Sequence, residues 1–209
     1  DYSNTVIYSS ARHAYIVPRM KRMMNRTVWA MTKQLRKGSF KPEGYEVSFG
    51  SGKIDRIDTC ETEDQVYVKI LDYKTGAKSF DMAAFYHGLQ MQLVVYMEEA
   101  VRLEERKHPG KKIVPAGIFY YRMKDPIVGK ELDEEKLEEA ILKELRLDGI
   151  IRQEDAVIQR LDADFSGNSL VIPAGKTKSG YSKASKMLLP EEFDAVLTYA
   201  QKRRTDLQG

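Results

Sequence analysis

Two aspartates and a lysine in the first half of the chain have the types and spacing of a metal-dependent hydrolase. Asp55 lies in G-K-I-D-R-I-D at residues 52–58, and Asp72 and Lys74 lie in L-D-Y-K-T-G at residues 71–76. Neighbouring carboxylates tolerate ionisation best around a hard cation, and oxygen ligands suit Mg²⁺ or Mn²⁺. A lysine beside that cation stabilises a developing oxyanion or orients a water. Together these groups have the chemistry of a phosphodiester hydrolase site.

The two runs flank the polar turn E-T-E-D-Q and are predicted to form an antiparallel hairpin. A turn centred between Glu63 and Asp64 sets Asp55 directly opposite Asp72. Directly opposed residues share a face of the sheet, with Cβ atoms about 4.5–5.5 Å apart. The strand period of two adds Lys74 to that face. The alternative interpretation is a surface ion pair between strands, with no catalytic role.

A polar pair on a predicted helix is a third candidate element. Gln92 and Tyr96, in G-L-Q-M-Q-L-V-V-Y at residues 88–96, are four positions apart and so share a helix face. On an otherwise apolar helix, this pair either borders the site or marks a half-exposed edge. The residues alone leave both interpretations open.

Charge is unevenly distributed along the chain. The net charge of +3 does not by itself indicate a nucleic-acid binder, but basic residues dominate residues 1–44 and acidic ones residues 131–164. A Gly- and Ser-rich segment at residues 175–189 has no acid and holds Lys176, Lys178, Lys183 and Lys186. We interpret this segment as a loop whose lysines bind along a DNA strand; the alternative is an ordinary solvated loop.

The elements that must position these residues follow from hydrophobic periodicity. Helices are predicted over residues 19–37, 81–107, 132–147, 152–161 and 190–204. Extended segments are predicted over residues 45–57 with a bend at Gly50–Gly52, over 66–73 and over 113–122, while residues 164–189 form a loop or a small hairpin. The predicted class is α/β, with a small mixed central sheet flanked by helices.

Length and composition set the remaining bounds. The chain has 209 residues, which suits a single domain or at most two small ones. Within it we distinguish a basic helical part (1–44), a part with the catalytic hairpin, long helix and strand (45–125), and a helical, Lys-rich part (126–209). Cys60 is the only cysteine, so an internal disulfide is excluded. With no apolar run long enough to span a bilayer and no leader visible, we expect a cytoplasmic protein without a membrane partner. Because the chain begins with Asp1, we expect a processed chain or a fragment.

These motifs together resemble the RecB-type nuclease domain of the PD-(D/E)XK superfamily, and most closely the type found in the B subunit of bacterial AddAB (RexAB) helicase–nucleases. The resemblance rests on G-K-I-D-R-I-D, D-Y-K-T-G and Q-L-V-V-Y, supported by Y-S-S-A-R-H-A-Y at residues 8–15 and E-G-Y-E-V-S-F-G at residues 43–50. It implies a restriction-endonuclease-like fold.

The resemblance also implies roles for individual residues. Asp55, Asp72 and the backbone carbonyl of Tyr73 would bind the metal ion, and Lys74 would be the catalytic lysine. The resemblance further assigns Gln92 and Tyr96 to a Q-x-x-x-Y motif that assists DNA contact and site architecture, with Glu46 as a supporting residue. The implied activity is an Mg²⁺-dependent exodeoxyribonuclease that processes DNA ends in double-strand break repair by recombination.

The implied partners are single-stranded DNA at duplex ends and the helicase A subunit. A DNA-binding or scaffolding domain of the same fold, inactive in isolation, is the alternative, and an unrelated sheet protein is a third. The family's G-x-x-x-H pattern is missing, since neither His13 nor His87 fits it, and there is no Walker motif. An iron–sulfur cluster is expected in the full-length protein, but its cysteines are absent from this chain.

Overall fold

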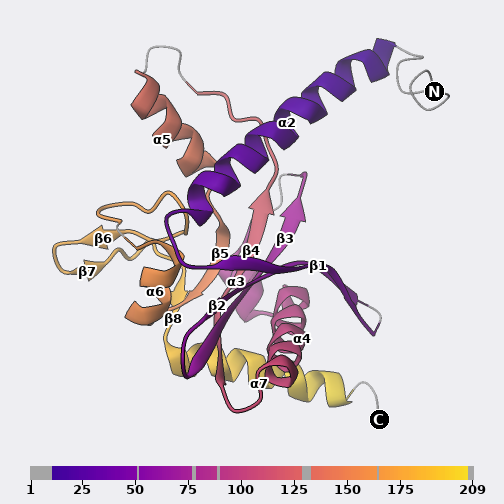
Figure 1. The fold of residues 1–209 in the computed structure, drawn as a ribbon, viewed down its shortest axis with the longest axis vertical. Coiled ribbons are helices and arrows are strands. Elements are labelled where there is room, and N and C mark those ends of the chain that lie inside the picture. The colour runs from indigo at the N-terminus through magenta and orange to yellow at the C-terminus, as the bar shows by residue number, and fades with distance from the viewer. Residues whose placement is uncertain are drawn as a thin grey trace.

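A six-stranded mixed sheet organises the computed structural model, which describes residues 11–50, 52–76, 79–88, 90–128, 133–163 and 165–206 (Figure 1). The strand order is β1-β2-β3-β4-β5-β8, with β3–β4 and β5–β8 parallel and the other neighbours antiparallel. The strands are β1 (Lys41–Phe49), β2 (Gly52–Glu61), β3 (Gln65–Lys74), β4 (Lys112–Arg122), β5 (Asp148–Arg152) and β8 (Met187–Leu188). The predicted α/β class with a small mixed sheet is confirmed.

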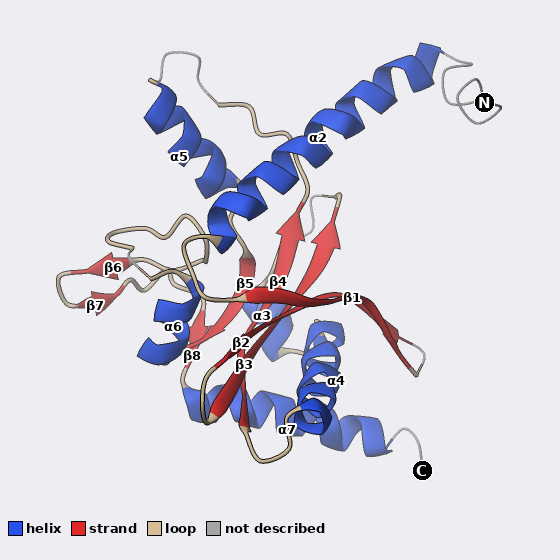
Figure 2. Ribbon diagram, viewed as in Figure 1, coloured by secondary structure: helices blue, strands red, loops and turns tan. Residues whose placement is uncertain are grey.

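Helices flank this sheet, as Figure 2 shows. Helices α4 and α7 pack on one face, and α6 packs on the other, together with the loop that carries the β6–β7 hairpin. Helix α2 extends away from the sheet toward its N-terminal end (Figure 1). The helices are α2 (Ala11–Leu35), α3 (Met82–Tyr86), α4 (Met91–Lys107), α5 (Glu134–Glu144), α6 (Asp155–Leu161) and α7 (Pro190–Asp206), and the small hairpin pairs β6 (Lys176–Thr177) with β7 (Gly180–Tyr181).

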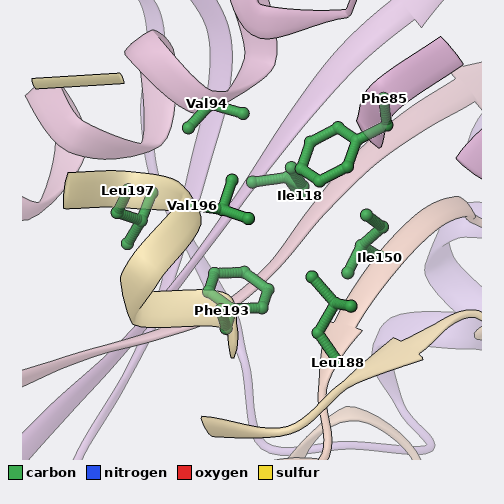
Figure 3. A pocket seen from close by; sticks show the side chains of 8 residues that line it. All are labelled: Phe85, Val94, Ile118, Ile150, Leu188, Phe193, Val196 and Leu197. Atoms are coloured by element: carbon green, nitrogen blue, oxygen red, sulfur yellow. The ribbon is translucent and has the colours of Figure 1, made fainter. Parts of the chain in front are cut away.

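Strand β3 is buried on both faces, which explains its nearly continuous apolar sequence. Val68 and Ile70 belong to the core on the α4 side, and Tyr67 and Leu71 belong to the core on the α6 side. Apolar side chains from α3, α4, α7 and the sheet converge on the α4 side, where they enclose a cavity of only about 10 Å³ (Figure 3). This seam is therefore a packed core rather than a ligand pocket.

The glycine pair at residues 50 and 52 was predicted to bend one extended segment, and that prediction is wrong. The segment instead belongs to two antiparallel strands, β1 and β2. Gly50 has a φ of 42°, in the left-handed region that turns favour. The glycines therefore separate two strands and create an outer hairpin beside the predicted one.

The helix predicted over residues 81–107 is two helices. Asp81 caps α3, and its side chain accepts a hydrogen bond from Ala83 N at 2.8 Å. Gly88, with a φ of 75°, follows α3, and α4 begins at Met91. In the sequence, only a single glycine marks the break between the two helices.

Strands β5 and β8 were missed. Helix α5 ends at Glu144, earlier than predicted, and β5 follows. Gly149 in β5 lies so close to β4 that a Cβ atom there would be 2.0 Å from the carbonyl oxygen of Ile118. Such short strands carry little periodic signal, so their pairing partners decide their structure.

A buried ionic cluster lies on the α6 side of the sheet. Arg56, Asp58 and Lys69 are each at most 4% exposed. The Arg56 guanidinium donates to both Asp58 oxygens, at 2.5 and 2.8 Å, and Lys69 Nζ lies 3.4 Å from Asp58 Oδ2. Arg56 also donates to Tyr73 OH at 3.3 Å. Burial lowers the pKa of the Lys69 ammonium, and the Asp58 carboxylate opposes that shift. One carboxylate therefore holds two buried cations between β2 and β3.

Replacing Asp58 by Ala should lower the free energy of unfolding by about 3–5 kcal/mol, because Arg56 and Lys69 would remain buried without a counter-charge. Denaturant unfolding measures this loss. The matched control is Glu138→Ala, which breaks a half-exposed ion pair with Lys33 at 3.1 Å and should cost at most about 1 kcal/mol. Equal losses in the two variants would contradict this interpretation.

Candidate active site

The β2–β3 hairpin has the predicted register. Its pairs run from Glu61 with Val66 to Arg56 with Leu71. Asp55 and Asp72 are the next two residues outward in this register, and Asp72 shares the face of Ile70, which α4 covers. Asp55 Oδ2 accepts a hydrogen bond from Tyr73 N at 2.8 Å. The Asp55 carboxylate thus lies against the peptide that joins Asp72 to Tyr73.

Asp72 and Lys74 are in direct contact. Asp72 is only 6% exposed, and the Lys74 ammonium forms an ion pair with its Oδ2. Lys74 Nζ also lies 5.4 Å from the centre of the Tyr120 ring, and Tyr120 stands directly opposite Asp72 on β4. Burial raises the pKa of the Tyr120 phenol, and the carboxylates of Asp72 and Asp148 add to the rise. Tyr120 therefore remains a neutral surface beneath the ammonium.

Gln92 and Tyr96 lie on the helix that covers this face. Gln92 Nε2 donates to Tyr96 OH at 2.5 Å, and Tyr96 belongs to the same core cluster as Ile70 and Tyr120. The Tyr96 ring meets the Phe49 ring edge-on, with centroids 5.4 Å apart. The pair thus joins α4 to the end of β1, while Gln92 remains exposed. Their role in DNA contact stays a prediction.

Glu46, predicted to support the site, forms an ion pair with Lys53. The pairs on either side, Tyr45 with Arg56 and Val47 with Ile54, set Glu46 opposite Asp55. Its φ of 50° is left-handed, which interrupts the alternation of side chains along β1. The Glu46 carboxylate is exposed and forms an ion pair with Lys53 at 3.1 Å. A supporting role for Glu46 therefore stays a prediction without a contact to favour it.

The structure adds Asp148, which the sequence did not reveal, and gives Lys186 a partner. Asp148 stands opposite Tyr120 on β5 and is 8% exposed. Its Oδ2 accepts from Phe80 N at 2.8 Å and its Oδ1 from Lys186 Nζ at 2.6 Å. Lys186 also donates to Phe80 O at 2.8 Å. Lys186 thus links its own segment to those of Phe80 and Asp148, so the proposed DNA surface does not include it.

The other predicted DNA-binding lysines lie on or near the β6–β7 hairpin. Lys176, Lys178 and Lys183 are exposed, and Lys176 Nζ lies 4.6 Å from the centre of the Phe165 ring. The hairpin protrudes from the side of the sheet opposite β1 (Figure 1). Its position permits contact with a nucleic acid, and that role stays a prediction.

The donor atoms at the site suit a hard divalent cation. The predicted donors are the carboxylates of Asp55 and Asp72 and the carbonyl of Tyr73, all oxygens. In the described ranges no cluster of three or more His, Cys, Asp or Glu residues forms a metal site. Mg²⁺ commonly uses one or two carboxylates together with waters and substrate phosphates, so this donor set fits it. Cys60 is buried, and burial raises the pKa of its thiol, which disfavours a thiolate donor there.

The hairpin pairing, the contact of Asp55 with Tyr73 N and the Asp72–Lys74 ion pair match the D-x-K pattern of the predicted nuclease site. The chain belongs to the PD-(D/E)XK nuclease superfamily, whose family description matches residues 3–180. The restriction-endonuclease-like fold is thereby confirmed. Among the described residues, no helix combines the length and apolar character needed to cross a membrane.

Several relatives are named as the B subunit of an ATP-dependent helicase/deoxyribonuclease. The protein from Alkaliphilus metalliredigens is 36% identical over 97% of this chain and 20% of its own length. The one from Lachnoclostridium phytofermentans is 37% identical over 95% of this chain, and the one from Clostridium acetobutylicum 35% over 94%, each across 19% of its own length. The chain thus spans about a fifth of these relatives.

Replacing Lys186 by Met should lower the free energy of unfolding by about 1–3 kcal/mol, because the buried Asp148 carboxylate loses its charged donor. Thermal and denaturant unfolding measure this loss. The exposed Lys183 is the control, and Lys183→Met should change the free energy by less than about 0.5 kcal/mol. A Lys186→Met protein as stable as the wild type would show that the ion pair contributes nothing.

Proposed function

We propose that this chain is a metal-dependent deoxyribonuclease domain that hydrolyses phosphodiester bonds in single-stranded DNA. The observation that carries the proposal is the convergence of Asp55, Asp72 and Lys74 at one end of the β2–β3 hairpin. The names of the relatives support DNA as the substrate.

Each residue has a distinct part in the proposed mechanism. Asp55, Asp72 and the Tyr73 carbonyl would hold Mg²⁺ or Mn²⁺, which when bound supplies Lewis-acid polarisation of the phosphoryl group. Lys74 faces the substrate as an ammonium, where it stabilises the charge that develops on the phosphoryl oxygens and orients a water. Its contact with Asp72 fixes the position of the ammonium before substrate arrives.

The wider role follows from the relatives and is likewise a proposal. In a helicase–nuclease, this domain would cut single strands that a helicase A subunit separates at duplex ends, during the recombinational repair of double-strand breaks. Such a complex would act in the cytoplasm. An iron–sulfur cluster in the longer protein would take its cysteines from outside this chain, which has Cys60 alone.

Changing the site residues separates metal binding from catalysis. Asp55→Ala and Asp72→Ala should weaken Mg²⁺ binding measured by calorimetry, because each removes an anionic oxygen ligand. Lys74→Ala should retain metal binding but lose about 10²–10³-fold in cleavage of a labelled single-stranded oligonucleotide. The matched control is Lys53→Ala, which removes a lysine that is paired with Glu46 on the outer hairpin.

Two outcomes would contradict the assignment. Equal Mg²⁺ affinity in the wild type and both aspartate variants would remove the metal site, and a normal cleavage rate for Lys74→Ala would remove the catalytic lysine. Mg²⁺ binding and DNA binding without cleavage, both in this chain and in the complete helicase–nuclease, would favour the scaffolding alternative.

The hairpin lysines should contribute to DNA affinity through charge. Neutralising Lys176, Lys178 and Lys183 together should weaken binding of a single strand and reduce its salt dependence by up to about 0.7 slope units per lost contact. Fluorescence anisotropy at several salt concentrations measures the slope. The control is Lys136→Ala, which removes an exposed lysine that is paired with Asp133 on α5. An unchanged slope in the triple variant would leave these lysines as an ordinary solvated loop.

A further inference from the structure

A second cation stands beside the catalytic lysine. Arg122 is the last residue of β4 and lies directly opposite Lys74 in the parallel β3–β4 register. Tyr120, two residues earlier, is opposite Asp72. Since side chains alternate along a strand, Arg122 shares the face of Tyr120, Asp72 and Lys74. The strands β3 and β4 end side by side (Figure 2), so Arg122 borders the open end of the site.

Other cations around this end of the sheet have acidic partners. Lys124 pairs with Glu144 at 2.5 Å, Lys53 with Glu46 at 3.1 Å, and Arg22 with Asp125 at 3.6 Å. Arg122 forms no ion pair of 4.0 Å or less with any residue inside the described ranges. It is partly exposed, and its influence on Glu144 is weaker than that of Lys124. Its guanidinium is thus available to a ligand that approaches Lys74.

The chemistry of the site indicates what that ligand is. Lys74 is held by Asp72 and would face the phosphate that is cut. A DNA strand brings further phosphates, and the carboxylates of the site would repel any that a cation does not offset. A guanidinium is planar and presents paired N–H donors that match two phosphate oxygens. An arginine one strand away from the catalytic lysine is suited to the next phosphate along the strand.

We propose that Arg122 binds the DNA phosphate adjacent to the scissile one and so positions the strand for cleavage. This inference rests on the proposed nuclease function and deepens it, because it assigns a second phosphate subsite on the same sheet face. Arg122 acts on a phosphate that does not react, so it is a positioning residue, and its loss reduces binding more than the chemical step.

The test is a scan of single phosphates. A series of single-stranded oligonucleotides carries one uncharged methylphosphonate linkage at successive positions. Their binding to this chain is measured by fluorescence anisotropy, with Ca²⁺ in place of Mg²⁺ so that the strands stay intact. A separate assay with Mg²⁺ maps where the wild type cuts the unmodified strand. Arg122→Ala, Arg122→Lys and the control Lys124→Ala are compared with the wild type.

We expect the effect of Arg122 on binding to be confined to one phosphate position. The affinity of the wild type should fall about 3–10-fold when the phosphate next to the cut is neutral. The affinity of Arg122→Ala should not change when that one phosphate is neutralised, and the salt dependence of its binding should be lower by about 0.7 slope units. Arg122→Lys should recover the slope but only part of the affinity, because an ammonium cannot bind in a bidentate manner. Lys124→Ala should show the wild-type pattern at every position.

The outcomes distinguish this inference from the function on which it rests. If Arg122→Ala shows the same positional losses and the same slope as the wild type, the phosphate subsite is overturned even though cleavage proceeds. If the wild type cuts no DNA with Mg²⁺ but Arg122 couples to one linkage, the phosphate contact stands and the nuclease proposal fails. Thermal unfolding of each variant confirms that a loss of binding does not reflect a loss of fold.

Discussion

Pairing between β2 and β3 decides which side chains share a face of the sheet, and the candidate active site depends on it. A shift of one residue would send Asp72 and Lys74 to the α6 side and leave Asp55 without a partner. The ionic cluster on the opposite face resists such a shift. Asp58 stands directly across from Lys69 and binds Arg56 on its own strand. A slip would separate these buried charges at a cost of several kcal/mol.

The short run of residues 55–58 therefore has two functions on two faces. Asp55 lies against Tyr73 N, and Ile57 points to the α4 side, where it pairs with Ile70 in the core. Arg56 and Asp58 point to the other side and join the ionic cluster. The D-R-I-D pattern thus combines a candidate metal ligand with the residues that hold its strand in register, because alternate positions of a strand face opposite ways.

The sequence predicted those parts of the structure that local chemistry determines. The polar turn set the hairpin register, and the four-residue spacing of Gln92 and Tyr96 correctly placed them on one helix face, where the structure joins them by a hydrogen bond. The parts it missed depend on contacts between distant segments. Strand β5 is a five-residue strand beside β4, and Lys186 meets Asp148 across 38 positions. No periodicity in a short window encodes such a partner.

The negative charge of each carboxylate on a buried sheet face must be balanced by a cation or by hydrogen-bond donors. The location of these balancing groups distinguishes structural carboxylates from reactive ones. Asp72 and Asp148 flank Tyr120 on neighbouring strands, and Asp55 lies beside Asp72. Asp148 receives a backbone N–H and a lysine that also binds Phe80 O, so its charge is fully engaged within the fold.

Asp55 and Asp72 are compensated at the ends of strands instead. Asp55 accepts a backbone N–H from Tyr73, and Asp72 forms an ion pair with Lys74, the last residue of β3 and only partly buried. A carboxylate at a strand end can give up part of its contact with these protein donors and bind a metal cation beside a substrate phosphate there instead. A carboxylate enclosed like Asp148 cannot. Asp148 therefore has a structural role in this sheet, whereas Asp55 and Asp72 have positions that suit the metal ligands we propose.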